Sequence, residues 1–308
     1  MKHFLFYLSF LFLLACSKKE QPNLKGKLNV LSTGLLINEI LPNPKTGGAE
    51  FIELYNPTEQ TIDLHDLQLA RIHDDTLSPP KPITKQSSLF LPRTYKVITK
   101  DPSAILSQYA SKNPQDFIAM DAFPVLPNTR GSIALLRGDS LVDRLDYDER
   151  MHSPFIKDAK GVSLERRYMT EETNAPGNFT SAAASSGYAT PGYQNSQYQD
   201  IISDDKGIWL ANNTFSPDSH NSTDFLQIHY QFKQGSNMIT LHIFNDQGIR
   251  IRRLYDNYLL GTSGTLDWNG LDDAQQRLPV GIYLIYAEVY NAIDGVKKYR
   301  KSCVLSRK

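Results

Sequence analysis

Short runs of aliphatic, β-branched and aromatic residues, separated by Pro, Gly, Asn and Asp, recur along most of this chain. In residues 226–232 (LQIHYQF) and 239–243 (ITLHI), apolar and polar side chains alternate. A period of two residues places successive side chains on opposite faces of a β-strand, whereas an amphipathic helix needs apolar residues three and four positions apart. The pattern therefore predicts an all-β fold in which short strands form β-sandwiches.

The length of 308 residues is typical of about two domains. Residues 28–196 are predicted to form the first sandwich and residues 208–308 the second. Residues 197–207 lie between them and are predicted as a linker, because the second half of this segment is polar. One helix is expected in the first domain, where Asp101 can cap it and Pro102 can occupy its first position.

Charge and cysteine content exclude several classes of protein. The chain has 33 Lys and Arg against 33 Asp and Glu, so its formal net charge is zero. No overall positive field is available to hold nucleic acid non-specifically, although a local basic patch stays possible. The two cysteines, Cys16 and Cys303, are too few for a disulfide framework or a Cys-rich zinc site. Cys303 is expected to be a small buried residue.

The amino terminus has the organisation of a signal peptide, predicted here for residues 1–15. Lys2 provides a basic start, and residues 4–14 (FLFYLSFLFLL) form an apolar run. This run is too short to span a bilayer, because a transmembrane helix needs about 20 apolar residues. Residues 16–27 follow and are expected to be a polar tether.

Residues 13–16 (LLAC) resemble the lipobox of bacterial lipoproteins. The resemblance implies that the signal peptidase recognises Leu13, Leu14 and Ala15 and cleaves after Ala15. It also implies that the Cys16 thiol carries a diacylglycerol through a thioether, which would anchor the protein in a membrane. Ser17, by resemblance to gram-negative lipoproteins, permits export to the outer membrane. The alternative is an ordinary secretory signal with an incidental cysteine.

Several blocks of the predicted first domain occur in a characteristic order. They are residues 37–44 (INEILPNP), 51–56 (FIELYN), 62–64 (IDL), 163–166 (SLER) and 189–196 (ATPGYQNS). Together these blocks resemble a lamin-tail domain, and the resemblance implies an immunoglobulin-like β-sandwich. Bacterial domains of this kind resemble accessory modules on exported proteins, and some of those exported proteins are nucleases.

A second set of blocks covers the predicted second domain. They are residues 213–218 (NTFSPD), 243–248 (IFNDQG), 268–273 (WNGLDD) and 278–283 (LPVGIY). These blocks resemble the immunoglobulin-like domain of flagellar hook-capping proteins, and equally the C-terminal modules of large bacterial surface proteins. The resemblance implies a sandwich used for display, stacking or sorting. Trp268 is expected to fill its core.

Three glutamates are candidate ligands for a calcium ion. Glu39, Glu50 and Glu53 lie on neighbouring predicted strands, and carboxylate oxygens are the ligands that Ca²⁺ prefers. The alternative is that these side chains form hydrogen bonds to strand ends and loops. Asp218 and Asp224 are weaker candidates, because the loop between them lacks the Gly residues and the middle Asp of a cation-binding turn.

Residues 67–85 depart from the lamin-tail pattern and are expected to be an inserted loop. This segment carries His73, Asp74 and Asp75, which are candidates for a metal or acid–base cluster. Adjacent residues rarely converge on one point, so a solvated loop is the alternative. No catalytic residue and no small-molecule cofactor are assigned, and calcium is the one cofactor considered.

The sequence thus predicts a non-catalytic, lipid-anchored protein of the cell envelope whose two immunoglobulin-like domains serve binding, display or scaffolding. Its partners are expected to be the membrane, through Cys16, and a protein, glycan or nucleic acid. One alternative is an exported metal-dependent hydrolase, similar to a nuclease, which requires the acidic residues to converge on a cleft. The other is a DNA-binding surface protein, which requires a basic patch such as residues 297–301 (KKYRK).

Overall fold

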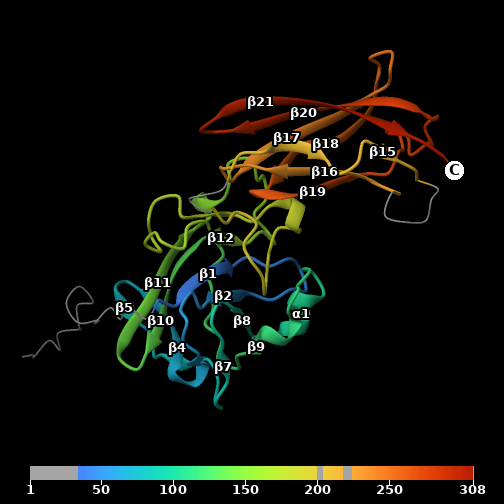
Figure 1. The fold of residues 1–308 in the computed structure, drawn as a ribbon. Coiled ribbons are helices and arrows are strands. Elements are labelled where there is room, and N and C mark those ends of the chain that lie inside the picture. Colours follow the sequence, from blue (N-terminus) through green and yellow to red (C-terminus); the bar gives the residue numbers. More distant parts are fainter. Residues whose placement is uncertain (1–33, 200–203, 218–223, 308) are drawn as a thin grey trace, which may run out of the picture.

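The structure is a computed structural model that describes residues 34–199, 204–217 and 224–307. It consists almost entirely of β-strands, and in these ranges the one α-helix is α1 (Pro102–Leu106). The strands form two stacked bodies, a first body coloured blue to yellow-green and a second body coloured yellow to red (Figure 1). The predicted all-β fold class is confirmed.

The first body contains a six-stranded sheet in the order β13-β12-β1-β2-β8-β9. Its strands are β1 (Leu36–Leu41), β2 (Phe51–Tyr55), β8 (Tyr95–Thr99), β9 (Phe117–Ala119), β12 (Leu164–Arg166) and β13 (Phe179–Ser181). Neighbouring strands are antiparallel except β8 and β9, which run parallel. This order places β12 beside β1, although the two strands are far apart in the sequence.

A second sheet packs against the first, in the order β11-β10-β4-β5 with β6 also paired to β4. Its strands are β4 (Leu67–His73), β5 (Thr76–Leu77), β6 (Lys81–Pro82), β10 (Arg130–Arg137) and β11 (Ser140–Asp148). A separate short pair joins β3 (Ile62–Asp63) to β7 (Leu89–Phe90). Apolar residues of both sheets, including Ile37, Ile52, Leu69 and Ile133, form one continuous core.

The prediction that residues 67–85 form an inserted loop is wrong. Leu67–His73 is strand β4, which pairs with β10 on one side and with β5 and β6 on the other. Leu67 and Leu69 pack into the main core, while Ala70 and Ile72 join an apolar cluster on the opposite face. A strand that is buried on both faces loses the simple apolar–polar alternation, which is why the pattern did not reveal it.

Helix α1 covers part of the outer face of the six-stranded sheet. The Asp101 carboxylate accepts hydrogen bonds from two backbone N–H groups of the first turn, and Pro102 opens the helix, as predicted. Ile105 packs with Phe51 and Val97 in a small apolar cluster. Short 3-10 helices lie at Leu64–Asp66, Pro114–Asp116, Glu149–Met151 and Ala184–Ser186.

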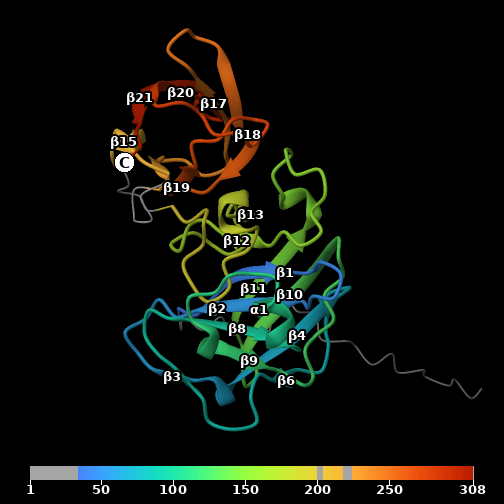
Figure 2. The same cartoon turned by 90° about the vertical axis from the view of Figure 1, so that its right-hand side faces the viewer.

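The second body has a three-stranded sheet, β14-β16-β19, and a five-stranded sheet, β15-β21-β20-β17-β18. Their strands are β14 (Gly207–Leu210), β15 (Thr214–Phe215), β16 (Leu226–Gln231), β17 (Asn237–Phe244), β18 (Arg250–Leu260), β19 (Ser263–Trp268), β20 (Gly281–Asn291) and β21 (Gly295–Leu305). Seen along the strands, the two sheets curve around a common interior (Figure 2).

Aromatic residues fill that interior. The Trp268 side chain is completely buried, and its ring centroid lies 5.2 Å from that of Phe215 and 5.6 Å from that of Tyr283. Alternate residues of β16 and β17, such as Ile228 and Ile239, point into the same core. The predicted core position of Trp268 is therefore confirmed.

Each body has its own hydrophobic core, and the domain boundaries drawn from the sequence stay predictions. Strands β12 and β13 and the chain that follows them lie between the bodies in both views (Figures 1 and 2). Gln197 and Gln199, at the start of the predicted linker, are buried. Within the described ranges, no helix has the length and hydrophobicity needed to cross a bilayer.

Candidate functional site

Three glutamates form a row on the outer face of the six-stranded sheet. Glu39 on β1 lies opposite Glu165 on β12 and opposite Glu53 on β2. The next row of the sheet, which contains Ile40 and Leu164, faces the hydrophobic core, so the glutamates point to the opposite side. Glu39, Glu53 and Glu165, called here the glutamate cluster, are completely buried.

An irregular segment, residues 189–199, covers the glutamate cluster and is called here the strap. Each carboxylate accepts a hydrogen bond from one backbone N–H of this segment. The bonds run from Thr190 N to Glu39 Oε1 (2.9 Å), from Gly192 N to Glu53 Oε2 (2.6 Å) and from Gln197 N to Glu165 Oε2 (2.9 Å). The strap forms no strand, and the glutamates supply the acceptors that its buried N–H groups require.

Two asparagines extend this network. The Asn38 amide donates to Glu53 Oε1 and to Asn195 Oδ1, both at 2.7 Å. The Asn195 amide in turn donates to the Arg166 carbonyl at 2.8 Å. Asn38 and Asn195 thus hold the strap to β1 and β12.

The hydrogen-bond geometry can accommodate a proton within the cluster. Thr190 Oγ1 lies 2.7 Å from Glu165 Oε1 and 3.2 Å from Glu39 Oε2. One hydroxyl hydrogen points at one of these acceptors at a time, and a hydrogen on the other carboxyl group would satisfy the second contact. Burial, and then the charge of Glu165, raises the pKa of Glu39 to about 8. Burial also raises the pKa of Glu53 and of Glu165.

Two of the three predicted calcium ligands, Glu39 and Glu53, are brought together, and Glu50 is not. The Glu50 carboxylate is half-buried and accepts from Leu126 N at 3.3 Å. In the described part of the chain, no group of three or more His, Cys, Asp or Glu residues is arranged to hold a metal ion. The oxygens of Glu39 and Glu53 accept hydrogen bonds from the strap, Asn38 and Ser163.

Other predicted residues lie apart from the cluster. His73 and Asp74 are exposed at the β4–β5 turn, where Asp74 and Asp75 have left-handed φ angles of 46° and 56°. Asp224 is half-buried before β16. Further predictions fall outside the described residues, namely those for Leu13, Leu14, Ala15, Cys16 and Asp218.

Glu165 was not predicted as a site residue. It lies between Leu164 and Arg166 in a short strand. Glu39 and Glu53 were selected because each is a glutamate within a predicted strand, and Glu165 meets the same criterion. Nothing local indicates that β12 pairs with β1, and the row of three glutamates exists only through that pairing.

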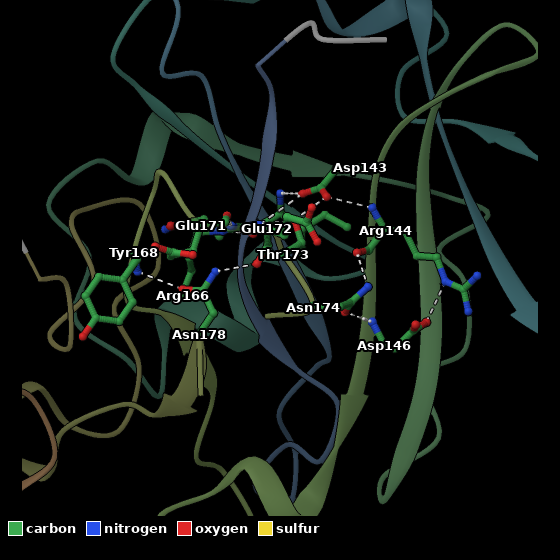
Figure 3. A network of polar contacts seen from close by, with 12 residues as sticks. Asp143, Arg144, Asp146, Arg166, Tyr168, Glu171, Glu172, Thr173, Asn174 and Asn178 are labelled. Atoms are coloured by element: carbon green, nitrogen blue, oxygen red, sulfur yellow. Dashed lines mark hydrogen bonds and ion pairs between the residues drawn. The ribbon is translucent and has the colours of Figure 1, made fainter. Parts of the chain in front are cut away.

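A second buried network lies on the core side of β12 (Figure 3). The completely buried Arg166 guanidinium donates to the Ile37 carbonyl at 2.9 Å and lies 3.3 Å from the Asp143 carboxylate. Thr173 bonds to both Arg166 and Asp143. Burial lowers the pKa of Arg166 to about 10 and raises that of Asp143. This ion pair ties β11, β12 and the loop that carries Thr173 together.

The strap also binds the second body. Thr262 N donates to the Ser196 carbonyl at 2.9 Å. The Gln197 side chain accepts from Ser236 N at 2.8 Å and donates to the Leu260 carbonyl at 3.1 Å. One segment is therefore hydrogen bonded to the glutamate cluster on one side and to the second body on the other.

A cleft of about 470 Å³ lies between the bodies. One wall is the strap, with Tyr193 and Tyr198, and the other comes from β16 and β19, with Tyr230 and Ser263. Most of the lining side chains carry a hydroxyl or an amide group, and Lys112 is the one charged residue in the part of the lining that the structure describes. The geometry provides a polar and almost uncharged surface held by two rigid walls.

The two packed sheets define the class of the protein: its first body is an immunoglobulin-like β-sandwich. Residues 32–149 match the family model described as Lamin Tail Domain, so the predicted lamin-tail domain is confirmed over that part of the chain. The match ends before β12 and the strap. The hook-capping type of the second body and the lipoprotein nature of the chain stay predictions.

Among solved structures, the chain is similar to dimeric latent PorU from Porphyromonas gingivalis and to PorZ, a surface component of the type IX secretion system of the same organism. Sequence identity is 11% and the TM-score is 0.27 in both cases. The similarity covers 89% of this chain and 20% of PorU, and 88% of this chain and 39% of PorZ. The chain therefore spans less than two thirds of either protein. No curated protein matches it.

Proposed function

We propose that this chain is a non-catalytic, lipid-anchored protein of the bacterial cell envelope that uses its two β-sandwich bodies for binding and scaffolding. In this proposal, Cys16 carries the lipid and residues 16–27 separate the bodies from the outer membrane. The support for the anchor is the sequence of residues 13–16, and the support for the scaffold is the arrangement of the buried carboxylates.

The proposal rests on one observation: the backbone N–H groups of the strap donate hydrogen bonds to the carboxylates of the glutamate cluster. A carboxylate that acts as a general base or binds a catalytic metal needs an oxygen directed at substrate, water or metal. Glu39, Glu53 and Glu165 are completely buried, and their oxygens accept hydrogen bonds from the chain itself. This arrangement supports a role in holding the strap.

The strap also supports a scaffold because it continues into the second body. Gln197 is buried and bonds to both Ser236 and Leu260. Ala184 of the first body packs against Met238 and Leu259 of the second. Two sandwiches joined in this way present the cleft and their outer loops in a fixed relation, as rigid frameworks with binding loops do.

The anchor is tested by metabolic labelling. Gram-negative cells that express the full chain are grown in medium that contains an alkyne-labelled palmitate. We expect label on the wild-type protein and none on Cys16→Ala, which should leave the membrane fraction. Cys303→Ala is the matched control, because it removes the other cysteine and should keep both the label and the membrane location. Equal labelling of Cys16→Ala and wild type would contradict the anchor.

The non-catalytic role is tested separately with the purified full chain. Supercoiled and single-stranded DNA are incubated with Mg²⁺ or Ca²⁺, and we expect no cleavage above that of a mock preparation. The hydrolase alternative would be established if the wild-type chain cleaves DNA, Glu39→Gln or Glu53→Gln abolishes this cleavage, and the exposed control Glu149→Gln retains it. Salt-dependent retention of DNA in a filter-binding assay would instead support a DNA-binding protein.

A further inference from the structure

We propose that the cleft between the two bodies binds a neutral oligosaccharide. This inference rests on the proposed function, a non-catalytic envelope protein that recognises a partner, and it names the chemical class of that partner. Three features carry it: the size of the cleft, its almost uncharged polar lining, and the tyrosine rings that the strap presents.

The dimensions and construction of the cleft suit a small ligand. Its volume of about 470 Å³ lies within the range of roughly 300–1,000 Å³ that is typical of small-molecule sites. The walls belong to different bodies, but the bond from Thr262 N to the Ser196 carbonyl fixes one wall against the other. A ligand therefore enters a site that is already formed, and little free energy is lost in ordering it.

The charge of the lining excludes two classes of ligand. Among the described residues that line the cleft, Lys112 is the one charged residue, and its Nζ lies 5.0 Å from the centroid of the Tyr193 ring. The carboxylates of Glu39 and Glu165 lie beneath the strap and are not part of the lining. A nucleic-acid strand needs several cations along its phosphates, and a divalent cation needs anionic oxygens. The cleft matches an uncharged ligand.

The polar groups of the lining can both donate and accept hydrogen bonds. Ser263 and Thr265 are exposed at the start of β19, and Gln194 is exposed on the strap. Thr265 Oγ1 is 2.8 Å from His229 Nδ1, so the two side chains are hydrogen bonded to each other. Hydroxyl and amide groups match the hydroxyls of a sugar, which also donate and accept.

The rings of Tyr193 and Tyr198 supply apolar surface. Both side chains are half-buried on the strap. Tyr193 N donates to the Thr190 carbonyl, and Tyr198 N donates to the Asn195 carbonyl, so turns hold both residues in place. A tyrosine combines a flat apolar face with a polar tip, and a pyranose ring presents a C–H face that packs on such a surface. Tyrosine side chains beside neutral hydrogen-bonding groups favour a sugar.

The test uses the purified full chain in a zwitterionic detergent without sugar head groups. Isothermal titration calorimetry and saturation-transfer NMR are run with linear tetrasaccharides of glucose, N-acetylglucosamine, mannose and xylose. Polygalacturonate and a single-stranded DNA oligomer are the anionic comparisons. We expect at least one neutral tetrasaccharide to bind and neither polyanion to bind in the cleft.

Three variants locate the site. Ser263→Trp, an exposed position, fills the cleft with a large ring and is expected to weaken binding at least tenfold. Ser302→Trp makes the same change at an exposed position on β21 outside the cleft and should bind like wild type. Tyr193→Ala should weaken binding, whereas Tyr193→Phe, which retains the ring, should largely restore it.

Three results overturn the inference. The first is the failure of every neutral tetrasaccharide to bind the folded chain. The second is tetrasaccharide binding that Ser263→Trp leaves unchanged. The third is polyanion binding that Ser263→Trp abolishes. The lipid-labelling and DNA-cleavage experiments decide the proposed function independently, so a wrong ligand class is distinguished from a wrong general role.

Discussion

Raising the pH from 6.5 to 8 is expected to destabilise the first body, because the glutamate cluster holds a proton that the unfolded chain releases. The pKa of Glu39 is raised to about 8 in the folded protein, against an ordinary value of 4.5. A raised folded-state pKa means that the folded state binds more protons than the unfolded state at intermediate pH. The stabilisation is complete below pH 4.5 and is lost as the pH rises through the folded pKa.

The size of the effect follows from the width of the pH interval. Each pH unit in which the folded state holds one extra proton changes the free energy of unfolding by about 1.4 kcal/mol. Because Glu39 has lost half of its proton at pH 8, the loss attributable to this residue between pH 6.5 and 8 is about 1.6 kcal/mol. The raised pKa values of Glu53 and Glu165 act in the same direction.

Few other groups with shifted pKa values titrate in this interval. Hydrogen bonds lower the pKa of Asp63 and Asp148 to about 2, so these residues affect stability only in acid. Burial lowers the pKa of His152 to about 4, so its contribution is lost as the pH falls from 6.5 towards 4. Burial raises the pKa of the Cys303 thiol to about 12, so its effect appears above its unfolded value of 9.

The measurement is urea unfolding at constant ionic strength, followed by circular dichroism, at pH 6.5, 7.25 and 8. Wild type should lose stability across the series, and Glu39→Gln, which has no proton to release, should lose clearly less. Glu149→Gln is the matched control at an exposed position and should behave like wild type. Equal pH slopes for wild type and Glu39→Gln would refute the reasoning.

Three further predictions concern the strap, the buried ion pair and the free thiol. Gly192→Ala is expected to destabilise the protein by about 1–3 kcal/mol, because its φ is 87° and a Cβ would lie 2.8 Å from Ser111 Oγ; an unchanged urea midpoint would contradict this. Asp143→Ala leaves the Arg166 guanidinium buried without its carboxylate and should cost about 3–5 kcal/mol in the same assay, whereas Asp143→Asn should cost less. In a Cys16→Ala background, Cys303 should react with a thiol reagent much more slowly in the folded state than in urea, because it is buried and its pKa is raised; equal rates would show an accessible thiol.

The sequence predicted those features of the fold that depend on neighbouring residues. The alternation of apolar and polar residues predicted that Ile228 and Ile239 lie in the core. Asp101 and Pro102 predicted the cap and the start of α1. Strand β4 was missed because burial on both faces removes the alternation. Its place in the sheet depends on pairing with β10, which no local pattern encodes.

The site was less predictable for the same reason. Glu39 and Glu53 were identified as neighbours because β1 and β2 are consecutive strands. Glu165 joins them only because β12 returns to pair with β1. The strap has no period at all, and its course is set by the acceptors beneath it. Thr190 and Gly192 are recognisable as its anchors only once the three carboxylates are placed.

The glutamate cluster and the strap are therefore best understood as one unit. Three carboxylates in a buried row repel one another and lack water, so each would be costly in isolation. A segment without strand pairing has the opposite need, since its buried N–H groups require acceptors. When the strap covers the glutamate cluster, its N–H groups gain acceptors and the carboxylates gain donors. A proton retained on the cluster removes part of the repulsion between the carboxylates. Because Ser196 and Gln197 also hold the second body, the stability of the cluster determines the geometry of the cleft.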